Sequence, residues 1–532
     1  MMKTYLTIAS LVGLVFTSHA LADSTYTYVL QDSVATITGF TSTASPSGAI
    51  AIPSTVDGYV VGEIGAAAFK NQTAVTSITF ASSVNVTRIG ISAFQGCTAL
   101  ASISLPSSIT QIDGGAFADC SSLTTISLPD GLTTLGESVF LNCESLVSLT
   151  IPDSITTIPG QLCDHCTSLT TLSLSDAVTE IGNAAFYDCS AMASFTMPES
   201  LVTLGDDAFH GCGALTTITM GDALSSIGDR VFQDCDSLVS ISVSSGNPTY
   251  SSEDGVLLNA SQTSVVLCPE GKLGDYTIPV MVESLAEGAF AHCDLLTSVS
   301  LPSGLTDLPA DAFYYASGLE SVELPTNISS IGDWCFAGCS SLAGVTFPEA
   351  LTTLGDDSFD SCLSLEWALF NGDAPDMGES VFDHTADAFT VYYYSSSTGF
   401  ESPTWLGYPA VALEIPSSFA TWLTGNGYSP GTSMATDTNS DGVSLLMAYA
   451  LNLDPSENLA SSMPQPVLAD DEMSLSFYGN SSDVTYTAET STDLENWTTD
   501  GVSLSDPDAN GLRTAEVAQD GASRFIRLVV SY

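Results

Sequence analysis

A 23-residue repeat runs through most of this chain and constrains its fold more than any other feature. Phenylalanines recur every 23 residues in two runs, with one double step inside the first run and a longer gap between the runs. They are Phe94, Phe117, Phe140, Phe186, Phe209, Phe232, Phe290, Phe313, Phe336, Phe359 and Phe382. Cys163 takes the position that the double step leaves open. A period of this length predicts a stack of similar coils rather than one compact domain.

Each repeat carries apolar residues at fixed offsets that describe one coil. The unit from Leu123 to Cys143 has the pattern Leu-x-x-Ile-x-Leu-Pro, then Leu, Leu-Gly, Phe and Cys. The first segment alternates as a short strand does, the proline ends strand pairing, and we expect the later glycine to supply a turn with unusual φ. One coil cannot bury its apolar side alone. We therefore predict a β-rich solenoid of about twelve stacked coils between Val75 and Leu365.

The repeat resembles the BspA-like class of bacterial leucine-rich repeats. The motif Ile-Gly-x-x-Ala-Phe-x-x-Cys-x-x-Leu-x-x-Ile-x-Leu-Pro carries the likeness, which covers about residues 26–410. It implies an N-terminal strand cap at 23–53, a solenoid at 54–388 with a hairpin insertion at about 244–279, and a C-terminal cap at 389–414. Such proteins are typically secreted or held at the cell surface, and several act in adhesion and protein binding. The resemblance implies the same role here.

Residues 1–22 have the features of a secretory signal. Lys3 precedes an apolar run from Tyr5 to Phe16, and Ala20-Leu21-Ala22 is a small-x-small cleavage pattern. The apolar run is too short to span a bilayer as a helix. We therefore expect a chain that is exported, cleaved after Ala22, free of membrane spans, and secreted or held outside the cell by contacts.

The charge of the chain excludes several classes of partner. Its 532 residues include 61 Asp plus Glu against 8 Lys plus Arg, a formal charge of −53, although 44% of the residues are hydrophobic. A chain this apolar is no disordered acidic tail, and a chain this acidic is repelled by nucleic acids and anionic membranes. The acids stand after the Ile-Gly step or after the proline, as Asp206 and Asp153 do, and avoid the strand.

The outward positions of the predicted strands carry hydroxyls and almost no charge. The candidates for a ligand face are Thr125, Thr150, Thr171, Thr196, Thr217 and Thr219, with serines at equivalent places in other coils. Parallel rows of hydroxyls suit an extended, repetitive ligand such as a glycan or a strand-rich protein. One alternative is that Ser and Thr are simply the neutral residues of an exposed strand. Another is an ice-binding face, which the mixture of Ser and Thr disfavours.

Ten of the thirteen cysteines share one position, three residues after the phenylalanine position. They are Cys97, Cys120, Cys143, Cys166, Cys189, Cys212, Cys235, Cys293, Cys339 and Cys362. A free cysteine behaves as a small buried hydrophobe, which the interior of a coil requires. We predict a structural ladder of mostly free thiols rather than disulfides or metal sites. Pairs among Cys163, Cys166, Cys335 and Cys339 remain open as exceptions.

A candidate calcium loop lies in residues 415–465, which otherwise predict a short helical segment. Asp437, Asn439 and Asp441 have the spacing of the first half of an EF-hand or dockerin-type loop, with Val443 offering a backbone carbonyl. Ala448 replaces the bidentate acid expected at position 12. Calcium is the predicted cofactor, and an acidic helix N-cap is the alternative.

Residues 466–532 predict a small β-sandwich, because short alternating runs are separated by turn residues. Together with the segment before it, this region resembles a C-terminal module of other exported bacterial proteins.

No catalytic motif is present in the sequence. There is no Gly-x-Ser-x-Gly, no His-Glu-x-x-His and no phosphate-binding loop, so no catalytic residue is assigned. The sequence predicts an exported, non-enzymatic, monomeric protein that binds or adheres to a protein or glycan. The alternatives are a structural component of the cell envelope or extracellular matrix, and an accessory protein of polysaccharide degradation.

Overall fold

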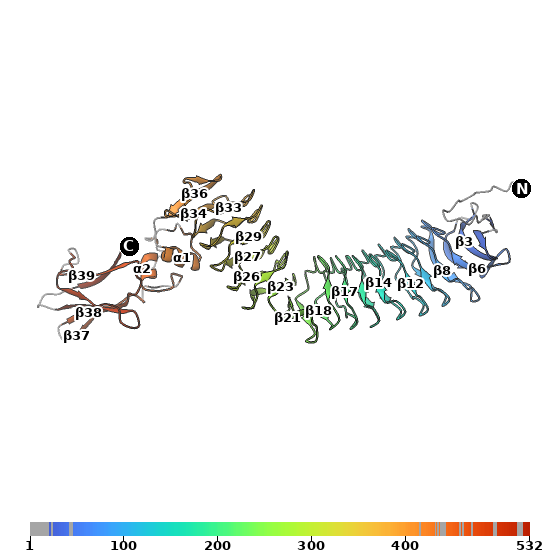
Figure 1. Cartoon of the computed structure of the whole chain (residues 1–532), viewed down its shortest axis with the longest axis horizontal. Coiled ribbons are helices and arrows are strands. Elements are labelled where there is room, and N and C mark those ends of the chain that lie inside the picture. Colours follow the sequence, from blue (N-terminus) through green and yellow to red (C-terminus); the bar gives the residue numbers. More distant parts are fainter. Residues whose placement is uncertain are drawn as a thin grey trace.

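The chain forms an elongated stack of short strands followed by two short helices and a β-rich module (Figure 1). This computed structural model describes residues 21–22, 25–41, 46–413, 417–430, 432, 436, 443–456, 459, 462–469, 472–492, 497–518 and 525–531. The predicted leucine-rich solenoid is confirmed, with about 16 turns instead of about twelve. The additional turns arise because cap segments without the 23-residue pattern also stack on the repeats.

One strand of each coil joins a parallel ladder, and we call the outer surface of this ladder the strand face. Its strands are β4 (Gly48–Ile52), β7 (Val75–Phe80), β9 (Ser102–Ile103), β11 (Thr125–Ile126), β13 (Ser148–Thr150), β15 (Thr171–Ser173), β18 (Thr217–Met220), β20 (Ser240–Val243), β24 (Gly274–Thr277), β26 (Leu296–Ser300), β28 (Ser321–Glu323), β30 (Gly344–Phe347), β32 (Trp367–Phe370), β34 (Thr390–Tyr394) and β36 (Tyr408–Leu413). The antiparallel strand β35 (Thr404–Trp405) closes the end. The ladder is interrupted at residues 192–198, where no strand forms, near the insertion, and between β28 and β30.

A second, shorter strand in each coil builds another parallel ladder, which the repeat pattern alone did not reveal. Its members are β3 (Val34–Phe40), β6 (Tyr59–Ile64), β8 (Arg88–Ile89), β10 (Gln111–Ile112), β12 (Thr134–Leu135), β14 (Thr157–Ile158), β16 (Glu180–Ile181), β17 (Thr203–Leu204), β19 (Ser226–Ile227), β25 (Ser284–Leu285), β27 (Asp307–Leu308), β29 (Ser330–Ile331), β31 (Thr353–Leu354) and β33 (Asp376–Met377). In the N-terminal cap, β1 (Leu21–Ala22), β2 (Tyr26–Gln31) and β5 (Thr55–Val56) pair antiparallel with their neighbours.

The third side of each coil is a tight turn around the phenylalanine position, which we call the turn edge. Two residues per coil have positive φ, two places before and two places after that position, as Ser138 (56°) and Asn142 (57°) do around Phe140. This conformation aims alternate N–H groups at the next coil, and Phe140 N donates to Leu162 O at 2.9 Å. Regular coil-to-coil bonds of this kind offset the cost of left-handed backbone at residues other than glycine.

The expected role of the glycine in the Ile-Gly or Leu-Gly step was wrong. Gly136 and Gly228 do not have positive φ. A Cβ atom at Gly136 would lie 2.3 Å from the backbone nitrogen of Gly114, and one at Gly228 would lie 2.5 Å from that of Asp206. Glycine stands here because successive coils approach too closely for a side chain.

The repeated phenylalanines stack along the inside of the solenoid. Neighbouring ring centroids lie 5.3 Å apart for Phe94 and Phe117 and 5.0 Å apart for Phe313 and Phe336, with nearly parallel planes. The rings are fully buried. Except at Cys163, which replaces the phenylalanine, each coil thus contributes one buried ring to the apolar contacts that join it to its neighbours.

The solenoid has two arms that meet at an insertion, near β21 and β23 in Figure 1. The insertion contains the antiparallel strands β21 (Tyr250–Glu253), β22 (Val256–Asn259) and β23 (Ser264–Leu267). Leu257 packs into the core of the first arm, whereas Val256 and Leu258 pack into the core of the C-terminal arm. Strand β22 therefore stands between two hydrophobic cores.

The C-terminal module consists of two helices and two small antiparallel sheets. Helices α1 (Ser417–Gly425) and α2 (Leu445–Ala450) precede the strands. Strands β37 (Val467–Ala469), β38 (Glu472–Tyr478), β41 (Leu512–Ala518) and β40 (Val502–Leu504) form one sheet, and β39 (Thr485–Ser491) pairs with β42 (Phe525–Ser531). Side chains from both sheets share one core, including Phe477 and Tyr486.

The predicted secretory signal falls almost entirely outside the described residues. Of its 22 positions, only Leu21 and Ala22 are described, and they form the edge strand β1 beside β2. Among the helices that the structure describes, none is both long enough and apolar enough to cross a membrane.

Candidate binding faces of the solenoid

The six threonines proposed for ligand binding are all exposed on the strand side of the first arm. Thr125 and Thr171 lie on β11 and β15, each opposite Ser148 of the strand between them. Thr217 and Thr219 lie opposite Ser240 and Ser242. Thr150 ends β13, and Thr196 lies in the segment 192–198 that has no strand. The parallel register thus aligns the hydroxyls of neighbouring coils in rows.

A neighbouring row of hydroxyls differs because it bonds to the protein itself. Thr124, Thr170 and Thr216 stand one residue before the face positions, and each donates to a backbone carbonyl of the preceding coil, at 3.2–3.4 Å. In the part of the chain that the structure describes, the side chains of Thr125, Thr150, Thr171, Thr196, Thr217 and Thr219 make no such hydrogen bond. Their hydroxyls remain open to solvent and to a ligand, as donors and acceptors.

The strand face ends where helix α1 covers it. Leu369 of β32 is fully buried and packs with Leu413 and with Ala420 of α1, with Trp367 and Tyr392 around them. Ser429 also donates to the hydroxyl of Tyr392 at 3.2 Å. Trp367 and Leu369 stand at the positions that carry hydroxyls in other coils, and this contact within the chain explains why they are apolar. The open strand face belongs mainly to the first arm.

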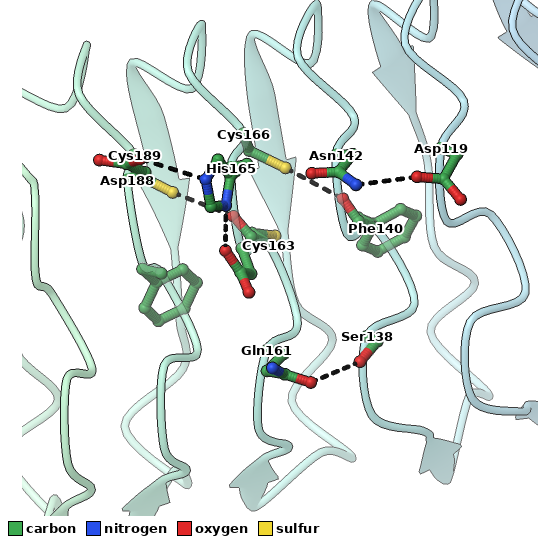
Figure 2. A network of polar contacts seen from close by, with 12 residues as sticks. Asp119, Ser138, Phe140, Asn142, Gln161, Cys163, His165, Cys166, Asp188 and Cys189 are labelled. Carbon is green, nitrogen blue, oxygen red and sulfur yellow. Dashed lines mark hydrogen bonds and ion pairs between the residues drawn. The ribbon is translucent and has the colours of Figure 1, made fainter.

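Polar side chains form columns along the turn edge (Figure 2). Asn142 donates to Asp119 at 2.8 Å, and Ser138 donates to Gln161 at 3.1 Å, each pair joining successive coils. One coil further, His165 lies between Asp164 and Asp188, with 3.3 Å from its Nε2 to Asp188. These contacts hold coils together and leave few of the polar groups free for chemistry.

All thirteen cysteines are buried free thiols, so none of the disulfides left open among Cys163, Cys166, Cys335 and Cys339 is formed. The ladder thiols have a polar role that burial alone does not suggest. Cys143 Sγ donates to the carbonyl of Phe117, and Cys166 Sγ donates to that of Phe140, at 3.3 and 3.2 Å. Figure 2 shows the latter contact. Cysteine therefore fits this position as a small residue that also satisfies a buried carbonyl.

Burial also makes these thiols unreactive. It raises the pKa of Cys97 to about 11 and the pKa values of Cys212 and Cys362 to about 12. Because the thiolate is the reactive form, we expect almost no reaction with Ellman's reagent at pH 8 in the folded protein and thirteen free thiols in denaturant. A titration that finds markedly fewer thiols after denaturation would show that disulfides form.

The side-chain ligands proposed for calcium, Asp437, Asn439 and Asp441, lie outside the described residues. Val443 is described and buried, and it packs in a small apolar cluster with Ala448 and Leu459. Ser444 is the N-cap of α2 and accepts from Met447 N, so a serine rather than an acid caps this helix. Among the described residues, His, Cys, Asp and Glu do not form a group of three or more that could hold a metal ion.

The family model for the BspA type leucine rich repeat region matches residues 62–192, 156–269 and 268–387. The chain belongs to the BspA-type leucine-rich repeat family. Its solenoid accounts for the match, which ends before the C-terminal module. The likeness of that module to those of other exported proteins therefore stays a prediction. No curated protein matches the chain.

Two solved structures support the BspA-type solenoid. A leucine rich cell surface protein from Faecalibacterium prausnitzii is 29% identical, with a TM-score of 0.52, over 71% of this chain and 95% of that one. A leucine-rich repeat protein from Bacteroides ovatus is 23% identical, with a TM-score of 0.50, over 74% of this chain and 100% of that one. The second similarity concerns the fold alone.

Proposed function

We propose that this BspA-type protein is a non-enzymatic binding protein of the cell surface, and that the strand face of its first arm recognises an extended protein or glycan. The observation that carries the proposal is the pair of adjacent hydroxyl rows with different bonding. Thr124 and Thr170 bond to the preceding coil, whereas Thr125 and Thr171, one residue later, point their hydroxyls at solvent. A merely structural row would resemble the first kind.

Location at the cell surface is supported by similarity and by the sequence. The Faecalibacterium protein of the same fold is described as a cell surface protein. The predicted signal at residues 1–22 would bring this chain to the same compartment. Cleavage after Ala22 would remove β1 and leave β2 as the edge of the N-terminal sheet.

The proposal is tested by placing charge on the strand face. The triple variant Thr171→Lys, Thr217→Lys, Thr219→Lys places long cationic side chains where the ligand would lie. On a glycan array, we expect it to bind at least tenfold more weakly to the glycans that bind the unaltered protein. The matched control is Thr134→Lys, Thr157→Lys, Thr353→Lys, which adds the same charge at exposed threonines of β12, β14 and β31, on the second ladder. It should bind as the unaltered protein does.

Equal binding by the two triple variants would contradict the strand-face proposal, provided that both melt as the unaltered protein does. If no glycan is retained, the same pair of variants is compared on immobilised surface proteins. Loss of binding in the second-ladder variant alone would move the site to the second ladder.

Calcium binding by Asp437, Asn439 and Asp441, with the carbonyl of Val443, is also a proposal. Oxygen ligands at this spacing favour calcium over transition metals. Calorimetric titration of the chain should detect one calcium site that Asp437→Asn with Asp441→Asn abolishes. Unchanged heats in that double variant would reject the loop as the site.

A further inference from the structure

A second candidate surface lies on the turn edge of the C-terminal arm. Asp311, Trp334 and Asp357 hold the same place in three successive coils, two residues before the phenylalanine position. Asp311 N donates to the backbone of the next coil at 3.0 Å, and so does Trp334 N at 2.9 Å, which keeps these coils in register. We call these three residues the acid–indole column.

Trp334 is unusual for its place in the repeat. The equivalent positions of other coils hold small or polar residues, such as Ser138, Gln161 and Ser380. Its side chain is 40% exposed and meets the ring of Tyr314 edge-on, with 6.3 Å between ring centroids. Tyr315, whose ring contacts that of Tyr314, is 47% exposed. An exposed indole in contact with a half-buried tyrosine is typical of the anchoring residues of a binding surface.

The acids of the coils before and after Trp334 are crowded by other carboxylates. Burial, followed by the nearby carboxylates of Glu287 and Asp333, raises the pKa of Asp311. The pKa of Asp357 is raised by burial and by Asp360 and its acidic neighbours. Within the described residues, no Lys or Arg pairs with either carboxylate. The surface therefore favours a positively charged partner.

The first arm shows what a cation does at the same position. Arg230 stands two residues before Phe232, and its guanidinium donates to both carboxylate oxygens of Asp207 in the preceding coil, at 2.9 and 3.0 Å. This pairing lowers the pKa of Asp207. In the C-terminal arm the corresponding pair is Asp357 and Ser380, so the carboxylate is kept and the guanidinium is missing.

The C-terminal module contains an arginine that contacts both an indole and a carboxylate. The guanidinium of Arg527 lies 4.2 Å from the ring centroid of Trp497 and also contacts Glu489 at 2.6 Å. One arginine can thus stack on an indole and pair with a carboxylate at the same time, because its charge is planar and its donors lie at the edge. Trp334 with Asp311 and Asp357 offers the same indole and carboxylates.

We propose that the acid–indole column binds an arginine side chain from a basic segment of another protein. The guanidinium would stack on the indole of Trp334 and donate to Asp311 or Asp357. Lysine, a compact and strongly hydrated ammonium, would gain the charge attraction without the planar contact and the forked hydrogen bonds. This surface is separate from the strand face and does not depend on the function proposed for it.

The test uses the full chain and three short glycine–serine peptides that differ only in carrying arginine, lysine or citrulline. At about 150 mM salt, distant charges are screened. Calorimetry should then show arginine peptide binding about tenfold tighter than lysine peptide, and no binding of the neutral citrulline peptide. Trp334→Ser should remove the arginine preference, and Asp357→Asn, which keeps the shape of the side chain, should weaken arginine binding several-fold.

The matched control is Gln161→Ser, at the same coil position of the first arm, which should bind all three peptides as the unaltered chain does. Equal binding of the arginine and lysine peptides would overturn the proposal, because the negative charge of the surface would then be enough to explain the binding of both peptides. An arginine preference that survives Trp334→Ser in a folded variant would also overturn it. The proposal would also be overturned if Trp334→Ser abolished the binding of a neutral glycan but left the binding of the arginine peptide unchanged.

Discussion

Replacing Phe313 with alanine should destabilise the C-terminal arm by about 3–5 kcal/mol. The ring is fully buried between Phe290 and Phe336, with centroids 5.1 and 5.0 Å away and planes within 10° of parallel. Its removal leaves a cavity that neighbouring coils cannot close, because their own rings are fixed by the stack. Denaturant unfolding followed by tryptophan fluorescence measures the loss.

The control for this prediction is Leu363→Ala in the same arm, since Leu363 is 63% exposed. Its effect should stay within about 0.5 kcal/mol. Hydrogen exchange should also show faster opening of β26 to β30 in Phe313→Ala and little change in β9 to β15, because β22 separates the two cores. Equal acceleration in both arms would contradict the division of the solenoid into two cores.

Glu270→Gln should stabilise the protein above pH 8 by on the order of 3 kcal/mol. Glu270 is buried beside the junction of the arms; one carboxylate oxygen accepts from Asp234 N at 3.1 Å, and the other has no partner among the described residues. Burial, with Asp234 and Asp236 nearby, raises its pKa to about 8. Glutamine keeps the shape without the charge.

The sign of this pH dependence follows from the raised pKa. An unfolded glutamate ionises near its ordinary value of 4.5, so the folded state keeps its full stability below that pH. Stability is then lost as the pH rises towards about 8, because only the unfolded chain releases the proton easily. Melting temperatures of the two proteins should converge near pH 4.5 and diverge by pH 8. The exposed control Glu253→Gln is compared in the same way. Melting temperatures of Glu270→Gln and the unaltered protein that run parallel from pH 4.5 to pH 8 would show that the buried carboxyl does not cause the loss of stability.

The 23-residue period was enough to predict the parts of the fold that follow from burial. Phe140 and Cys143 are buried and Thr125 is exposed because side-chain alternation and stacking fix which side each residue faces. The second ladder could not be predicted in the same way. A strand as short as Thr134–Leu135 contains no alternation to recognise, and it forms only because the neighbouring coils hold it.

Features that depend on precise backbone geometry could not be predicted from the sequence either. Positive φ at Ser138 and Asn142 has no glycine to signal it, and the thiol bond from Cys166 to Phe140 depends on how far one coil is displaced from the next. Glu270 was missed because the insertion breaks the repeat and offers no equivalent position for comparison. Trp334 could have been found, since the repeat itself makes a tryptophan there an exception.

The central claim is that a ligand lies along the strand face of the first arm. Hydroxyl-radical footprinting of the unaltered protein, with and without a glycan or protein that it binds, tests this claim directly. We predict protection in the peptides around Thr171 and Thr217, and none around Thr134 and Thr157 on the second ladder. Protection of the second ladder with the strand face left fully reactive would contradict the claim.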